Sequence, residues 1–190
     1  ENLERAARLI PLVQAEGARV VGQLSSTLHY GDHETGLGLF GDAWAQMWTA
    51  DLLGEAPADS VTDAIAREAS GEPARRAIEG RPYFSYRGCI SNPVWLQMLK
   101  AMVRKGIDLG LDGFNTTHNY EGFCGCHYCA EVIRAHMRPL LTHGELDSLF
   151  DNGFDATVDV REPDDDAPDE LKRRYLVILE QAAARRRKAA

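Results

Sequence analysis

Apolar positions recur along the first part of the chain with the periods of a helix and of a buried strand. Residues 1–17 place apolar side chains three and four positions apart, which predicts an amphipathic helix. Residues 18–26 form a short apolar run that turns polar at its end, as a buried strand does. The glycine-rich residues 27–41 are expected to form a loop, and the aromatic residues 42–53 a helix.

The middle of the chain has the pattern of a strand, a helix and a second strand. Residues 82–89 and 111–117 are predicted strands. Between them, Asn92 is placed to cap a helix, Pro93 suits its first turn and Gly110 marks its end. Strands joined through a helix usually pair in parallel, so this part predicts a parallel sheet.

The last part of the chain continues the alternation of helices and strands. A helix is predicted from Ala130, and Thr142 with Glu145 has the spacing of a capping box for a short helix. Residues 156–160 are a candidate strand, and the acidic residues 162–170 are expected to link it to a final helix. The whole pattern predicts an α/β fold with about four βα units.

Composition and charge place the chain among ordinary globular proteins. It has 190 residues, of which 44% are hydrophobic, enough for a single domain spanning 1–190. Lys and Arg number 21 against 29 Asp and Glu, which gives a net charge of -8. An acidic chain has no general attraction for nucleic acid or for anionic membranes, and no stretch approaches the roughly 20 apolar residues that span a bilayer. We therefore expect neither nucleic acid nor membrane as a partner.

The chain begins at Glu1, directly on a helical pattern. This start predicts a piece of a longer polypeptide or a processed product. The location of the protein stays open. The cytoplasm is favoured, and the alternative is a compartment reached through a targeting segment that preceded Glu1.

Four cysteines carry the most specific chemical signal of the sequence. Three of them, Cys124, Cys126 and Cys129, lie within six residues, and Cys89 follows a predicted strand. Cys-x-Cys is a poor span for a disulfide, whereas four thiolates form a closed structural zinc site. In a parallel sheet the carboxyl ends of the strands share one edge, so Cys89 is the preferred fourth ligand and His127 the alternative. Four free thiols without a metal are the plainer interpretation.

Segments around these cysteines resemble a known family. They run Tyr86-Arg87-Gly88-Cys89-Ile90-Ser91-Asn92-Pro93-Val94-Trp95, then Asp112-Gly113-Phe114, then Cys124-x-Cys126-x-x-Cys129. Together they resemble the family 42 β-galactosidases and related bacterial glycoside-hydrolase-like barrels, over roughly residues 82–178. The resemblance implies a (β/α)8 TIM barrel, of which this chain would supply about four βα units. It also implies that all four cysteines hold a structural zinc ion at the carboxyl end of the strands.

The resemblance implies a position for the acid/base carboxyl of a glycosidase. Alignment on Gly113 and Tyr120 places Asn119 where the family has its acid/base Glu, and Glu121 lies two residues further on. Either Glu121 has taken over proton transfer or the chain has lost it. The nucleophile of the family would lie beyond Ala190.

Polar side chains at the expected strand ends are candidates for binding a sugar, because barrel enzymes keep their chemistry there. They are Asn115, His118, Asn119, Arg87 and His29. Arg87 has an alternative role as an ion-pair partner of Asp112.

Three functions are open at this point. The first is a glycoside hydrolase that acts on a galactoside-type carbohydrate, for which the resemblance also allows a homo-oligomer. The second is a catalytically degenerate barrel that binds carbohydrate. The third is a metal or redox protein that uses its cysteines directly.

Overall fold

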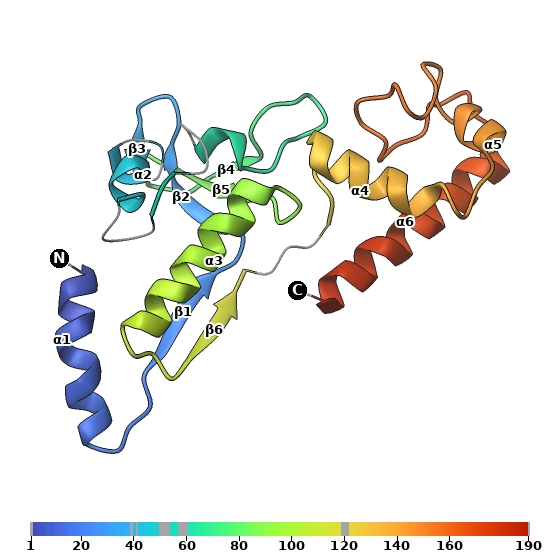
Figure 1. The fold of residues 1–190 in the computed structure, drawn as a ribbon. Helices are drawn as coiled ribbons and strands as arrows, with labels where there is room; N and C mark the ends of the chain where they lie inside the picture. Colours follow the sequence, from blue (N-terminus) through green and yellow to red (C-terminus); the bar gives the residue numbers. More distant parts are fainter. Residues whose placement is uncertain are drawn as a thin grey trace. The chain divides into compact units, whose positions relative to one another are not determined.

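The computed structural model describes residues 2–38, 40, 42–49, 54–56, 61–118 and 122–189. Its packing divides into two compact units (Figure 1). Unit 1 comprises Glu1–Ile65 and Arg75–Asn119, and unit 2 comprises Ala66–Ala74 and Tyr120–Ala190. None of the described helices combines the length and apolarity needed to cross a membrane.

A parallel pair of strands and two helices form one part of unit 1. The elements are α1 (Asn2–Ala15), β1 (Val21–Ser25), α3 (Pro93–Asp108) and β6 (Gly113–Thr117). β1 pairs with β6 in parallel, from Val21 opposite Gly113 to Ser25 opposite Thr117. α3 packs against β6 at Gly106, where an added Cβ would lie 2.6 Å from the Phe114 ring. The predicted helices and strands of these segments are confirmed.

An antiparallel sheet forms the other part of unit 1. Its strands are β2 (Leu28–Asp32), β3 (Leu37–Gly38), β4 (Arg75–Ala77) and β5 (Phe84–Arg87), in the order β3-β2-β5-β4. Two short helical segments, α2 (Asp42–Met47) and the 3-10 turn η1 (Val61–Asp63), accompany it. The prediction of a loop over 27–41 is wrong, because β2 and β3 form a hairpin there.

The expected TIM barrel is wrong. The described strands form a two-stranded parallel sheet and a four-stranded antiparallel one. A barrel of this kind needs parallel neighbours throughout, but β5 runs antiparallel to β2. Only Ser26 and Thr27 separate β1 from β2, and a parallel crossover needs a dozen or more residues. The candidate strand at 156–160 is also wrong, because these residues form turns and irregular chain.

Aromatic side chains build the core of unit 1. Trp95 and Tyr86 are fully buried, and Trp95 Nε1 donates a hydrogen bond of 2.8 Å to the Ser26 carbonyl. The chain at Gly88 runs so close to the indole that an added Cβ would lie 1.8 Å from a ring carbon. The tight approach fixes the chain immediately before Cys89.

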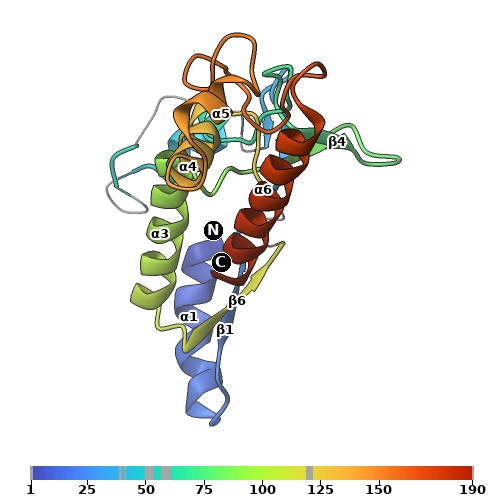
Figure 2. The same cartoon turned by 90° about the vertical axis from the view of Figure 1, so that its right-hand side faces the viewer.

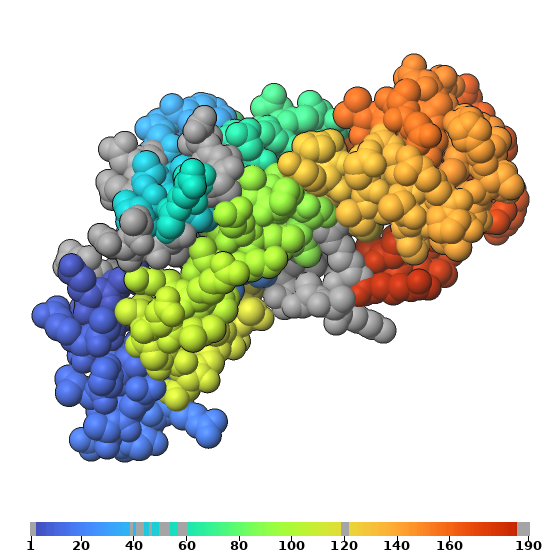
Figure 3. Space-filling view, viewed as in Figure 1, coloured from blue at the N-terminus to red at the C-terminus, as the bar shows by residue number. Residues whose placement is uncertain are grey.

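α1 and α3 lie against each other on one face of unit 1, where the blue α1 meets the yellow-green α3 (Figure 3). An open apolar cavity of about 630 Å³ lies between them and the parallel strands. Its lining includes Ile10, Met102, Leu111 and Phe114. The face of α1 that lines this cavity is therefore only partly covered by the rest of unit 1.

Unit 2 is helical in its described residues. Its helices are α4 (His127–Met137), α5 (His143–Asp147) and α6 (Asp169–Ala189), shown from two sides in Figures 1 and 2. They enclose Phe150, Phe154 and Tyr175, which are buried to within 2% of full coverage. The Tyr175 hydroxyl donates to the Val160 carbonyl at 2.5 Å. The predicted capping box of α5 is confirmed in both of its hydrogen bonds.

Candidate metal centre

The three clustered cysteines belong to a tight turn that leads into α4. Cys126 is the N-cap residue of this helix, and its Sγ accepts the backbone N–H of Cys129 at 3.5 Å. A thiolate at this position satisfies one of the N–H groups that every helix leaves unpaired at its start. α4 therefore begins at His127, three residues before the predicted start at Ala130.

Backbone hydrogen bonds to one extended segment position the cysteine-bearing chain. The Cys89 N–H donates to the Ala64 carbonyl at 3.1 Å, and the Gly125 N–H donates to the Arg67 carbonyl at 2.8 Å. Ala64 and Arg67 are three residues apart along the chain. The first of these bonds lies within unit 1 and the second within unit 2.

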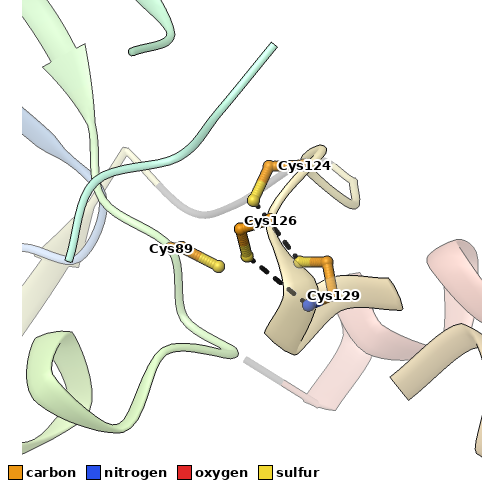
Figure 4. Close-up of side chains that lie close together, drawn as sticks. All are labelled: Cys89, Cys124, Cys126 and Cys129. Carbon is orange, nitrogen blue, oxygen red and sulfur yellow. Dashed lines mark hydrogen bonds between the residues drawn. The ribbon is translucent and has the colours of Figure 1, made fainter. Parts of the chain in front are cut away.

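The four sulfur atoms converge on one point. The Sγ atoms of Cys89, Cys124, Cys126 and Cys129 all lie within 4.8 Å of one another, and Figure 4 shows the side chains pointing together. None of the four is in a disulfide, and the Cys124 and Cys129 sulfurs are 3.6 Å apart. Sulfurs at two corners of a tetrahedral zinc site, each about 2.3 Å from the metal, would be about 3.8 Å apart. The cluster therefore has the size that a metal ion requires.

Burial favours a closed site at this cluster. Cys89 and Cys129 have no exposed surface, Cys124 is 3% exposed and Cys126 is partly buried. A catalytic zinc site keeps a position open for water or substrate, whereas four thiolates fill a tetrahedral shell. The four-cysteine cluster could therefore hold a metal ion.

His127 lies outside this group of sulfurs. Its ring packs on the ring of Tyr128, with the centroids 3.8 Å apart. The set of potential ligands that the structure brings together contains Cys89 and not His127.

A guanidinium group lies beside the cysteine turn. An added Cβ at Gly125 would be 3.3 Å from Nη2 of Arg161 and 2.4 Å from the Glu68 carbonyl oxygen. The Asp159 carboxylate raises the pKa of Arg161 through its hydrogen bonds, and the charge of Cys124 raises that pKa further. The turn is thus packed between a carbonyl and a cation that the sequence analysis does not single out. No motif in the sequence connects Glu68 or Arg161 to the cysteines.

The predicted catalytic positions, Asn119 and Glu121, lie outside the described residues. Of the predicted sugar-binding residues near them, Asn115 is exposed in β6. His118 is exposed just after β6, with a φ of 55° and with Nδ1 3.3 Å from the Ser25 hydroxyl. His118 thus lies at the carboxyl end of the parallel pair, whereas Asn115 lies in the middle of β6, opposite Gln23.

The other predicted sugar-binding residues lie in the antiparallel sheet. Arg87 is exposed at the end of β5. His29 packs edge-on against Trp95, with the ring centroids 5.0 Å apart, and burial lowers its pKa to about 4. Its Nε2 atom is buried and has no hydrogen-bond partner among the described residues. Asp112, the alternative partner of Arg87, accepts hydrogen bonds from the Gln14 side chain at 2.9 Å and the Val20 N–H at 2.8 Å.

Comparisons with known proteins return no relationship for this chain. No protein-family model, curated protein or solved structure matches it. The function is therefore argued from the cysteine cluster itself.

Proposed function

We propose that the protein is a zinc-binding protein in which Cys89, Cys124, Cys126 and Cys129 hold one structural zinc ion. The observation that carries the proposal is the convergence of four sulfurs, within 4.8 Å of one another, from residues up to 40 positions apart. Tetrahedral sulfur sites are typical of zinc and of iron. Zinc has no redox chemistry, which suits a centre buried within the fold.

The local structure around the cysteines supports a stabilising role for the ion. Residues 122–126 form neither helix nor strand, yet they contain two of the ligands. Three of the four cysteines are buried, and a bound ion would give all four sulfurs a common partner. Metal binding of this kind contributes directly to folding.

Cobalt substitution tests the proposal, because Co²⁺ replaces zinc and reports its ligands by absorption. We expect the metal-free protein to bind one Co²⁺ with strong sulfur-to-metal charge-transfer bands and the intense visible bands of tetrahedral geometry. Cys126→Ser should weaken the charge-transfer bands by about a quarter or abolish binding. His127→Ala, the matched control in the same turn, should leave the spectrum unchanged.

Two results would overturn the proposal. One is a protein that binds no cobalt and whose four cysteines titrate as free thiols. The other is a reversible disulfide between Cys124 and Cys129, whose sulfurs are 3.6 Å apart, which would favour redox chemistry.

Carbohydrate chemistry is the second candidate function. The resemblance to the family 42 glycosidases supports it, and so does one observation at the carboxyl end of β1 and β6. There the non-glycine residue His118 adopts a left-handed backbone and presents an exposed ring beside Ser25. Ligands of α/β proteins bind at the carboxyl ends of parallel strands, and strained backbone is frequent at functional sites.

A panel of nitrophenyl glycosides tests the hydrolase, with Glu121→Gln and His118→Ala as variants. Hydrolysis of a galactoside that Glu121→Gln abolishes would support it. Galactose binding without hydrolysis, lost in His118→Ala, would support a degenerate carbohydrate-binding protein. Absence of both would overturn this second candidate and leave the zinc site untouched.

A further inference from the structure

Arg161 occupies space that the glycine of the cysteine turn leaves open. A methyl group at Gly125 would approach Nη2 of Arg161 to 3.3 Å. Gly125 lies between two of the cysteines, Cys124 and Cys126. The guanidinium therefore lies directly against the backbone that carries two of the four sulfurs.

A carboxylate fixes the direction of this guanidinium. Nε of Arg161 donates to the two carboxylate oxygens of Asp159 at 2.8 and 3.0 Å, and the backbone N–H of Arg161 donates to the same carboxylate at 3.0 Å. The side chains of both residues are less than a quarter exposed. A planar group held by several bonds to one partner keeps its orientation, so its position beside the turn is set by the fold.

A metal ion bound by four thiolates has a net negative charge, which a cation beside the cysteine turn would stabilise. Four thiolates around one divalent ion leave two net negative charges on a centre that is mostly removed from water. In such surroundings an uncompensated charge is costly, and an adjacent positive charge offsets part of that cost. Outer groups of this kind also tune how tightly a metal is held.

We propose that Arg161 is the outer-shell cation of the four-cysteine metal centre and slows release of the metal. The inference rests on the zinc site proposed above. Arg161 is a positioning residue that acts through its charge on the thiolates at the turn. Asp159 aims the guanidinium and makes no contact with the metal.

Transfer of zinc to an excess of a colorimetric chelator measures the effect. We expect Arg161→Met, which keeps the length of the side chain without its charge, to release zinc about 10-fold faster than the parent. Arg161→Lys should fall between the two. Arg138→Met is the matched control, because Arg138 forms an ion pair with Asp155 at 2.8 Å in the same unit. Its release rate should equal that of the parent.

The Arg161→Lys variant separates an electrostatic role from a packing defect. Lysine keeps the positive charge without the shape of the guanidinium, so Arg161→Lys should release zinc more slowly than Arg161→Met. Equal release rates of these two variants, or equal release rates of Arg161→Met and a parent that carries one zinc, would overturn this inference alone. A parent without bound metal would overturn the proposed function and this inference together.

Discussion

The two units of the chain are stabilised by different means. In unit 1, hydrogen-bonded strands surround a core in which the backbone at Gly88 touches the Trp95 ring. In unit 2, helices and loops close over Phe150 and Tyr175 without a strand among the described residues. A sheet gives a backbone many mutually supporting hydrogen bonds, whereas irregular chain needs other anchors. Three of the four cysteines belong to unit 2, where a bound metal ion would have the most to stabilise.

Side chains replace sheet hydrogen bonds in the loops of unit 2. The buried Arg134 donates through Nε to the Phe154 carbonyl at 3.2 Å, and Tyr175 donates to the Val160 carbonyl. The Cys126 cap is such an anchor in the cysteine turn. Because two of the four sulfurs belong to this irregular turn, we expect its order to depend strongly on the metal.

Removal of the metal should produce the largest effect. Structural zinc contributes on the order of 10 kcal/mol to small domains, so chelation should lower the free energy of unfolding by at least about 5 kcal/mol. Hydrogen exchange followed by mass spectrometry should show the loss of protection concentrated in residues 122–137. Equal loss of protection along β1 and β6 would contradict the contrast between the units.

Gly88→Ala should be the most damaging single change in unit 1. The new methyl group would lie 1.8 Å from the fully buried Trp95 ring, which has no room to move. Overpacking of this severity should cost about 3 kcal/mol or more in urea denaturation. Gly113→Ala is the control, because nothing lies within 4 Å of the added Cβ there. Similar stabilities of the two variants would show that the tight contact is unimportant.

His29 should make unit 1 sensitive to acid. The pKa of His29 in the folded chain is about 4, below the ordinary value of 6.5. Between these pH values the imidazole is protonated in the unfolded chain and neutral in the folded chain. The contribution of neutral His29 to the free energy of unfolding is therefore present above pH 6.5 and is lost as the pH falls toward 4. We expect the free energy of unfolding to fall by about 2 kcal/mol between pH 7 and pH 5.

Comparison with His29→Phe isolates this effect, because acid also releases metal from thiolates. The variant keeps an aromatic ring against Trp95, and its stability should vary less with pH than that of the parent. His143→Gln is the control at a side chain that is 80% exposed. A pH dependence in His29→Phe equal to that of the parent would contradict the burial of a neutral imidazole.

Tyr175→Phe should have the smallest effect of the series. The change removes the hydroxyl that donates to the Val160 carbonyl and leaves the ring in the core of unit 2. Loss of one buried hydrogen bond should lower the free energy of unfolding by about 1 kcal/mol. Tyr30→Phe, at a side chain that is 52% exposed, should be neutral. Thermal denaturation of both variants gives the comparison.

Local signals in the sequence predicted local structure well. Asn92 caps α3 and accepts the Val94 N–H at 2.9 Å, as its place before Pro93 indicates. Gly110 follows the helix with a φ of 87°, a conformation that favours glycine. Caps and helix ends depend on neighbouring residues, so the sequence contains what is needed to predict them.

Pairing between distant segments was harder to predict. The glycines of residues 27–41 indicated a loop, but Gly31 and Gly38 lie opposite each other in a hairpin. An added Cβ at Gly31 would come within 2.5 Å of the Leu37 carbonyl, so glycine here permits close strands. Glycine content alone does not distinguish a loop from a hairpin of closely paired strands.

The sequence predicted the cysteine cluster, but the argument that led to this prediction was wrong. The sequence argument joined Cys89 to the other cysteines through the carboxyl ends of parallel strands. The strand before Cys89 is antiparallel, so this argument does not account for the convergence of the four sulfurs. Arg161 and Asp159 were not singled out, because no motif connects them to the cysteines and residues 156–160 had the pattern of a strand instead.

The zinc content of protein purified without added metal, measured together with that of Cys89→Ser and His127→Ala, tests the central claim most directly. Four converging sulfurs predict one zinc ion per chain in the parent and in His127→Ala, and a large loss in Cys89→Ser. A parent without zinc, or a Cys89→Ser variant that retains it in full while His127→Ala loses it, would contradict the four-cysteine centre.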